Sequence, residues 1–263
     1  MNLLRRALAP VPDEAWQKLD ADASDALKEH LTARRVIDFD GPYGPELAAV
    51  NLGTLAPIEL GAGITSGVRR VQPLIEVRVP FVLSRRALDD AARGAPDFDT
   101  SAAVEAARKL ALIEDRAVFD GCAPAGIRGL GEATPHPVIA LGDDALGYAD
   151  VVTRGLMALD DAGVSGPYVL LLGSLPYRRV AAVSAAYPPL RHLTTLVGGP
   201  VLRAPSLDGG LLLSQRGGDF RLTSGQDVSI GYHRDDGDRI ELFLLESFTF
   251  LVLSPEAVVR FAS

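Results

Sequence analysis

Histidine and carboxylate side chains are the residues of this chain best suited to hold a metal or to move a proton. The four histidines lie far apart in the sequence: His30, His136, His192 and His233. None has a second ligand-type residue at the spacing of a zinc site, so a metal site would have to assemble from distant segments. Glu114 and Asp115 could pair as acid and base, but adjacent helix positions diverge by about 100°. We therefore expect these two carboxylates to lie on a salt-bridged or solvated helix face.

The sequence also contains no complete motif for a catalytic nucleophile or for a phosphate-binding loop. Ser174 follows an expected strand but lacks the flanking glycine of a nucleophile elbow. Cys122 follows an expected helix end, where a small buried hydrophobic role is the better interpretation. The glycines between positions 126 and 131 do not have the dinucleotide-binding spacing, and the sequence contains no Walker lysine. We expect no catalytic residue, no metal and no cofactor, with a triad built from distant residues left open.

Composition excludes several classes of protein. The chain has 263 residues, one cysteine, 26 basic and 34 acidic residues, and a formal charge of −8. The acidic balance argues against general nucleic-acid binding and against an anionic membrane surface. One cysteine excludes an internal disulfide framework, and the longest apolar stretch, 242–253, is too short to span a membrane. The first 13 residues lack the apolar core of a secretion signal, so we expect a soluble, cytoplasmic protein.

The hydrophobic content is high at 48%, although only 6% of residues are aromatic. Alanine, valine and leucine supply the excess. Either this is simply an alanine-rich composition, or apolar surface is buried between subunits.

The elements that must position any site form an α+β pattern. Apolar residues at spacings of three and four predict an amphipathic helix over 13–32, and a short strand is expected over 34–39. A further short helix is expected over 84–93. The longest helical pattern covers 100–120 and ends at a glycine.

Two extended segments, 47–60 and 68–83, predict a hairpin that could reach about 45 Å. A two-stranded hairpin is marginal alone in water, so it should pack on something else, and another subunit is one such partner.

The second half of the chain alternates short strands and helices from about 122 to 224, with a loop over 184–189 where two prolines exclude regular structure. Two final strands, 227–233 and 239–253, flank a hairpin turn. The pattern predicts an inserted α/β-like middle and a chain that returns to its first domain.

Blocks of sequence in order along the whole chain resemble the encapsulin shell proteins of family 1, a group also labelled linocin or bacteriocin. They cover 8–10 with Trp16, 34–44, 73–76, 114–121, 166–168, 216–220, 225–232 and 246–250. The motifs Arg-Val-Ile-Asp-Phe-Asp-Gly-Pro-Tyr-Gly and Glu-Asp-Arg-Ala-Val-Phe-Asp-Gly are long enough to exclude chance. The total length also fits this family.

This resemblance implies the HK97 phage-capsid fold and a closed icosahedral shell of many copies, most simply with T=1. It also implies a division of the chain into five segments. These are an N-terminal helix and arm (1–46), an E-loop hairpin (47–83), a P-domain spine helix (84–121), an A-domain (122–224), and return strands completing the P-domain and E-loop base (225–263).

The resemblance further implies that the shell's inner surface holds a C-terminal targeting peptide of a cargo enzyme. The matching positions are Leu27, Leu31, Arg34, Val36, Asp38 and Ile230. The apolar members could form a groove while Arg34 and Asp38 orient a peptide backbone, and many sites facing one cavity would make weak contacts sufficient. The alternative is that the leucines only pin the N-terminal helix to its own domain.

The loop that lines the fivefold pore in this family matches Ser184, Ala185, Ala186 and Tyr187. Its small uncharged tip would select solutes by width and backbone dipoles. Some relatives place a flavin-stacking tryptophan after the hairpin, whereas this chain has Arg86 in that region, so no flavin is carried over.

The function implied is a shell without catalysis that encloses a ferritin-like iron-storage protein or a dye-decolorising peroxidase and admits small solutes. A phage major capsid protein is the alternative with the same fold, but the chain lacks a basic N-terminal arm for DNA. A peptidase or bacteriocin is the alternative of another class, opposed by the missing nucleophile motif. We expect no specific nucleic-acid partner and no membrane partner.

Overall fold

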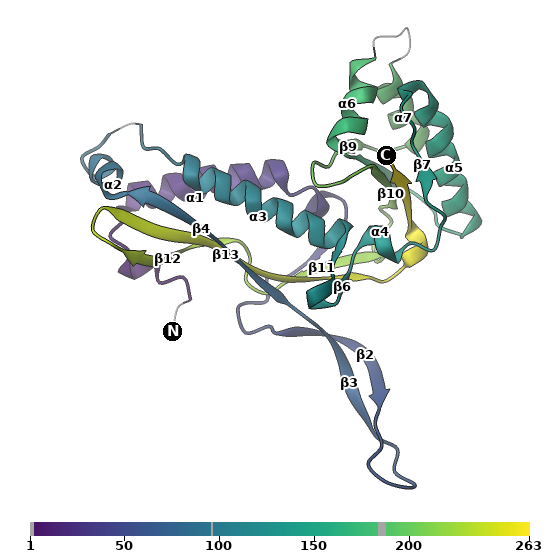
Figure 1. Cartoon of the computed structure of the whole chain (residues 1–263), viewed down its shortest axis with the longest axis horizontal. Helices are drawn as coiled ribbons and strands as arrows, with labels where there is room; N and C mark the ends of the chain where they lie inside the picture. The colour runs from purple at the N-terminus through teal and green to yellow at the C-terminus, as the bar shows by residue number, and fades with distance from the viewer. Residues whose placement is uncertain (1–2, 96, 184–187) are drawn as a thin grey trace.

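Two sheets and a projecting hairpin make up the architecture of the computed structural model, which describes residues 3–95, 97–183 and 188–263. Two long helices lie along a twisted sheet, a smaller α/β part stands at one end of it, and the hairpin extends away from both (Figure 1).

The two long helices are α1 (Asp13–His30) and α3 (Ser101–Phe119), which confirms both predicted patterns. Trp16 and Leu19 on α1 are buried against α3 and the first sheet, because the apolar spacing places them on one face. Burial of side chains this large contributes about 1.5–3 kcal/mol each. Helix α3 carries ten buried residues and forms the spine of this part of the molecule.

Strand β13 (Arg239–Val252) is the centre of the first sheet. Strand β4 (Ile75–Ser84) pairs antiparallel with one of its edges. Strands β12 (Ser229–Asp235) and β11 (Phe220–Ser224) pair with the other edge, and β1 (Asp38–Asp40) continues parallel to β11. The predicted final hairpin is confirmed by the antiparallel pairing of β12 with β13.

The projecting hairpin consists of β2 (Ala49–Pro57) and β3 (Gly67–Pro73). The sequence predicted one continuous arm over 68–83, and this is wrong, because the chain leaves the hairpin at Leu74 and continues as β4 in the first sheet. Buried Val79 and Phe81 explain the change, since their apolar face packs on the helices rather than projecting.

The second sheet has the order β7 (Ile139–Ala140), β14 (Val258–Ala262), β10 (Gly210–Ser214), β8 (Tyr168–Leu172) and β9 (Val201–Arg203). Helices α5 (Tyr148–Asp161), α6 (Ser174–Ala182) and α7 (Pro189–Val197) accompany it, with α5 contributing Val152 and Leu159 to its core. The alternation of strands and helices predicted for this region is confirmed.

Two strands lie in the opposite sheet from the one expected. The sequence placed β11 with the middle segment 122–224 and β14 with the return strands 225–263. Instead β11 pairs with β13 in the first sheet, and β14 pairs with β10 and β7 in the second. Strand β11 buries Thr223 and Ser224 beside Phe220 and Leu222, whereas β14 buries only apolar residues, so the burial pattern of neither strand specifies which sheet it joins.

The chain between α1 and β1 is the other departure. The strand expected over 34–39 is a 3-10 turn, η2 (Ala33–Arg35), followed by β1 only from Asp38. The remaining short elements are η1 (Arg6–Leu8), α2 (Arg85–Ala92), β5 (Gly121–Cys122), η3 (Ala123–Ala125), β6 (Ile127–Arg128), α4 (Leu130–Ala133), η4 (Ala145–Gly147) and η5 (Pro255–Ala257).

Gly129 marks where the chain passes closest to the end of α3. A Cβ atom at this position would lie 2.2 Å from the backbone nitrogen of Gly121 and 2.8 Å from the carbonyl oxygen of Phe119. Only glycine permits this approach, which seats the β5–β6 turn directly against the spine helix.

Candidate functional site

A groove of about 620 Å³ lies between α1 and the start of β12. Its apolar lining comes from four parts of the chain: Leu4, Ala23, Leu27, Leu31, Val228, Ile230 and Leu244. Leu27 on α1 and Leu31, one turn later and just past the helix end, supply one side, and the strand residues supply the other. An apolar trough with charged side chains at its rim is suited to an extended peptide with apolar side chains.

Four of the six residues matched to cargo binding meet in this groove. Leu27, Leu31, Arg34 and Ile230 all line it. Leu27 is half-buried, whereas Leu31 is 8% exposed and Ile230 only 2% exposed. Ile230 therefore belongs mainly to the hydrophobic core, and Leu27 offers a more accessible apolar contact.

Val36 and Asp38 do not face the groove. Val36 is 4% exposed and belongs to the core cluster of the second sheet. Asp38 accepts the backbone N–H of Gly218 at 2.6 Å. Val36 and Asp38 both line a separate polar hollow of about 130 Å³. A strand over 34–39 would have placed alternate residues on one face, but the 3-10 turn at Arg34 breaks that alternation.

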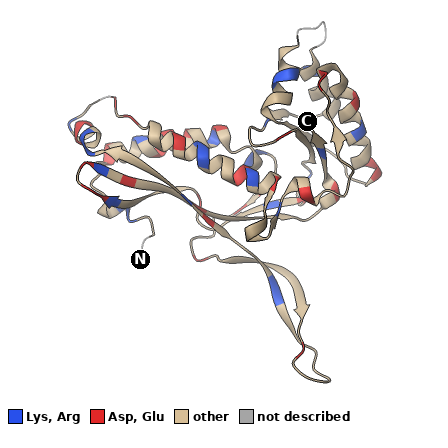
Figure 2. Ribbon diagram, in the orientation of Figure 1, with Lys and Arg blue, Asp and Glu red and all other residues tan. Residues whose placement is uncertain are grey.

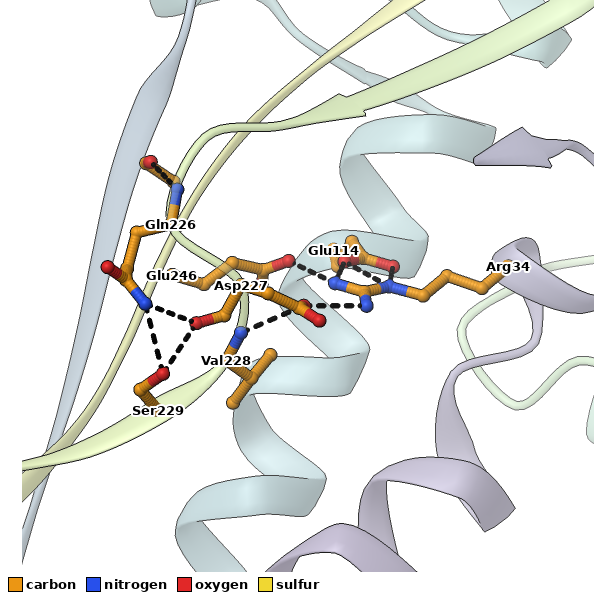
Figure 3. A network of polar contacts seen from close by, with 8 residues as sticks. Arg34, Glu114, Gln226, Asp227, Val228, Ser229 and Glu246 are labelled. Carbon is orange, nitrogen blue, oxygen red and sulfur yellow. Dashed lines mark hydrogen bonds and ion pairs between the residues drawn. The ribbon is translucent and has the colours of Figure 1, made fainter. Parts of the chain in front are cut away.

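Arg34 is held by acidic residues from α3, from β13 and from the loop before β12, as Figure 3 shows. Its Nε donates to both carboxylate oxygens of Glu114 on α3, at 3.0 and 2.9 Å. Its Nη2 also contacts Glu114, at 2.7 Å, and Glu246 on β13. Its Nη1 donates to Asp227 at 2.8 Å. The expected orienting contact between Arg34 and a peptide thus competes with an internal role.

Three carboxyl groups surround Arg34, whereas the network has only the one positive charge of its guanidinium. Glu114 and Glu246 are both 0% exposed. Burial raises the pKa of Glu246 well above its usual range, and the neighbouring Glu114 raises it further while Arg34 opposes the shift. The same acids raise the pKa of Arg34 against the opposing effect of its burial, so Arg34 remains charged. Burial thus favours the neutral form of Glu246, which reduces the excess of negative charge around Arg34.

Asp115 has a different partner from Glu114. It is 0% exposed, and its oxygens accept the backbone N–H groups of Ala33 at 2.8 Å and Thr32 at 3.2 Å. The prediction of a salt-bridged or solvated face holds for Glu114, which is ion-paired, and is wrong for Asp115. This carboxylate instead satisfies backbone donors at the start of η2.

The N-terminal segment forms one end of the groove, a contribution the sequence did not indicate. The backbone N–H of Tyr232 on β12 donates to the carbonyl of Leu4 at 2.7 Å. Arg6 contacts Asp20 on α1 at 2.7 Å and lies over the ring of Trp16. The available signal was Asp20, an acidic residue one turn before Ala23 on the helix face that also carries Leu27.

Asp227 is the second residue that the sequence analysis missed. It lies in the loop before β12, lines the groove, and accepts hydrogen bonds from Arg34 and from its own neighbour Val228. An Asp just before a strand commonly bonds to the backbone that follows it, so its position was a usable but weak signal.

The remaining expectations concern residues and groups outside the groove. Ser184, Ala185, Ala186 and Tyr187, expected to line a pore, lie outside the described residues. Over 3–95, 97–183 and 188–263, no group of three or more His, Cys, Asp or Glu residues is arranged to hold a metal ion. Cys122 is half-buried in β5. No described helix is long and apolar enough to cross a membrane.

Comparison with known proteins gives one consistent result. The protein family described as "Encapsulating protein for peroxidase" matches residues 1–249. A type 1 encapsulin shell protein of Rhodospirillum rubrum is 46% identical over 268 aligned positions, covering 98% of this chain and 96% of that protein. A type 1 encapsulin shell protein of Mycobacterium tuberculosis is 42% identical over 98% of each chain.

Solved structures of capsids have the same fold. A virus-like particle from Pyrococcus furiosus superposes with a TM-score of 0.69 over 94% of this chain and 98% of that chain, at 17% identity. The capsid of an empty GTA particle gives a TM-score of 0.59 over 89% and 90%, also at 17% identity. The expected HK97-like α+β fold is thereby confirmed.

Proposed function

The chain belongs to the type 1 encapsulin shell proteins, and on that premise we propose that its copies close into a T=1 icosahedral compartment around a cargo enzyme. The groove between α1 and β12 holds the cargo's C-terminal targeting peptide. The shell itself performs no catalysis and binds no cofactor.

The observation that carries the docking proposal is the convergence of Leu27, Leu31 and Arg34 from α1 and η2 with Ile230 from β12, although about 200 positions separate them. Peptide side chains would lie against the leucines, and burial of each apolar group would contribute about 25 cal/mol per Å². Individual sites need only modest affinity, because the enclosed cavity presents many of them at once.

The projecting hairpin supports the assembly proposal. Leu55 is 61% exposed and Val68 is 55% exposed, and the hairpin carries only three charged residues, Glu59, Arg69 and Arg70 (Figure 2). Surface of this kind is unfavourable in water unless a neighbouring copy covers it. We assign the hairpin to lie along the adjacent subunit.

A peroxidase is the first cargo class to test, because the matching family is described by that enzyme. A ferritin-like iron-storage protein is the second. Either cargo would use reactive small solutes that reach it through pores at the symmetry axes, with Ser184 to Tyr187 at the fivefold axis. The compartment would stand in the bacterial cytosol, consistent with one cysteine and no disulfide framework.

The first test is the particle itself. Untagged protein from its native host would be examined by light scattering and negative-stain electron microscopy. Uniform hollow icosahedral particles with a co-purifying enzyme support the proposal, and mass spectrometry then identifies the cargo. Stable monomers or dimers across pH and salt would contradict it.

The docking site is tested by Leu27→Asp, which places a charge in the trough at a half-buried position. We expect intact particles that retain less than about a tenth of the cargo. Glu29→Ala, an exposed position on the same helix outside the groove lining, is the matched control and should retain full cargo. The core position Ile230 is unsuited to this test, since a charge there would disturb folding.

A further inference from the structure

The loop before β12 and the end of α1 face each other across the groove, and a single carboxylate connects them. We infer that Asp227 is a positioning residue that joins the two sides and sets the width of the groove. This inference rests on the proposed docking function of the groove and assigns Asp227 a part in it.

The connection is made by one oxygen atom. Oδ1 of Asp227 accepts a hydrogen bond from Nη1 of Arg34 at 2.8 Å and another from the backbone N–H of Val228 at 2.9 Å. Arg34 belongs to the side formed by α1 and η2, whereas Val228 leads directly into β12. Because both donors converge on the same oxygen, neither side can move away without breaking a hydrogen bond to a charged group.

On the side of the groove formed by α1 and η2, two buried glutamates hold Arg34 in place. Glu114 takes the Nε and Nη2 donors of Arg34, and Glu246 takes Nη2 from β13. The Arg34 side chain is 17% exposed, whereas the side chains of both glutamates are fully buried. Its remaining nitrogen, Nη1, is the one that reaches Asp227, so Arg34 acts on the groove through Asp227.

The β12 side is fixed by a second set of contacts, also drawn in Figure 3. The backbone N–H of Gln226 donates to Oγ of Ser247 on β13 at 2.8 Å, and its side-chain Nε2 donates to Oγ of Ser229 at 3.0 Å. Ser229 Oγ donates in turn to the carbonyl of Asp227 at 2.9 Å. The loop is held to β13 at one end, and Asp227 ties it to Arg34.

Two roles for the Asp227 carboxylate predict different results. Its side chain is 41% exposed, so it could instead bind a cation of the peptide directly. A positioning role needs an acceptor atom at Oδ1, which asparagine also provides. A direct ionic role needs the negative charge, which asparagine lacks.

The experiment compares Asp227→Ala and Asp227→Asn in assembled shells, with Asp25→Ala as control. Asp25 is a 78% exposed carboxylate on α1 that does not line the groove. The probe is a synthetic peptide of the last 20 residues of the protein that co-purifies with the wild-type shell. Binding is measured by fluorescence anisotropy on opened shells and cargo content on intact ones, while hydrogen exchange follows 226–230 and 31–35.

We expect Asp227→Ala to weaken the peptide roughly tenfold and to speed hydrogen exchange in both segments, with unchanged assembly and melting. Asp227→Asn should stay within about threefold of the wild type, and Asp25→Ala should match it. Equal loss in Asp227→Ala and Asp227→Asn would overturn the inference in favour of direct charge recognition. Wild-type affinity or unchanged exchange in Asp227→Ala would overturn it outright.

Failure of the docking function remains distinguishable from failure of this inference. If the wild-type shell does not bind the peptide, the docking proposal fails, whereas the exchange measurement on empty shells still decides whether Asp227 holds the two sides together. Should Asp227→Ala fail to assemble, Arg34→Lys tests the same link. Its single ammonium cannot serve both the glutamates and Asp227, so exchange should rise in 226–230.

Discussion

The carboxylate of Asp115 accepts the backbone N–H of Ala33, 82 positions earlier in the chain, at 2.8 Å, and neither residue is exposed to solvent. This bond attaches the start of η2, and with it the end of α1, to the spine helix. Burial raises the pKa of Asp115 to about 7, while the hydrogen bonds from Ala33 and Thr32 oppose that shift. One side of the groove is therefore anchored by an acid that titrates near neutral pH.

Stability of the subunit should fall as the pH rises from 5 to 8. Asp115 and Glu246 both have folded-state pKa values above their ordinary 3.8 and 4.5, so the folded chain keeps protons that the unfolded chain has released. Their contribution is complete below those ordinary values and is lost as the pH passes through the folded-state pKa values. We expect a loss on the order of 1–3 kcal/mol, measured by guanidinium unfolding at fixed protein concentration.

Glu246→Gln tests the contribution of Glu246 to this pH dependence separately from that of Asp115. The amide keeps an acceptor for Arg34 and can donate toward Glu114 without taking a charge. Relative to the wild type, this variant should gain stability at pH 8 and change little at pH 5. A variant whose difference from the wild type is the same at both pH values would contradict the assignment.

Arg34→Met should be among the most damaging single substitutions in the chain. It leaves Glu114 and Glu246 buried without their cation, a change that costs about 3–5 kcal/mol. Thermal unfolding and the yield of assembled particles would measure it. Arg35→Met, at the exposed neighbouring position, should stay within about 0.5 kcal/mol. Similar melting temperatures for the two variants would show that the network does not stabilise the fold.

Gly129→Ala should disrupt the junction at the end of the spine helix. The added methyl group would meet backbone atoms of Gly121 and Phe119, which cannot move aside as a flexible side chain would. We expect a loss of about 3 kcal/mol or more in the free energy of unfolding. Gly147→Ala is the control, because no atom lies within 4 Å of its Cβ position and its φ is ordinary. A small change in the free energy of unfolding for both variants would contradict the close backbone approach at Gly129.

The double substitution Leu55→Lys and Val68→Lys should prevent assembly while leaving the fold of the subunit intact. These side chains lie on adjacent strands of the hairpin and are mostly exposed in the subunit, so the fold should tolerate the charges. The interface proposed for the hairpin should not tolerate these charges. We therefore expect subunits that have the circular dichroism spectrum of the wild type but do not form particles. Leu8→Lys, at a leucine 70% exposed and away from the hairpin, should still assemble. Normal particles from the double variant would refute the hairpin's role.

Local periodicity explains which elements could be predicted. Helices α1 and α3 were predictable because each buries one face in a repeating pattern, and the β12–β13 hairpin because residues 235–238 signal a turn between two strands. The sheet membership of β11 and β14 was not, because their apolar residues satisfy either sheet. Likewise, nothing local distinguishes Asp115 in a buried position from a carboxylate on a solvated face.

The candidate site was predictable in part and for a different reason. Family resemblance brought Leu27, Leu31, Arg34 and Ile230 together, whereas their spacing in the sequence alone would not have done so. Val36 and Asp38 failed as groove residues because a 3-10 turn replaced the expected strand. Asp227 was missed because its function depends on Arg34, 193 positions away.

The order in which the strands are synthesised determines when this subunit can first associate with another copy. Strand β13 is made after β4, β11 and β12, which all pair with it, and β14 is made after its two neighbours, β7 and β10. Neither sheet can therefore close before its own late strand, β13 or β14, has been synthesised. The hairpin is made early, but β4 at its base pairs with β13, so a chain that still lacks β13 has no completed sheet from which the hairpin can project toward a neighbouring subunit.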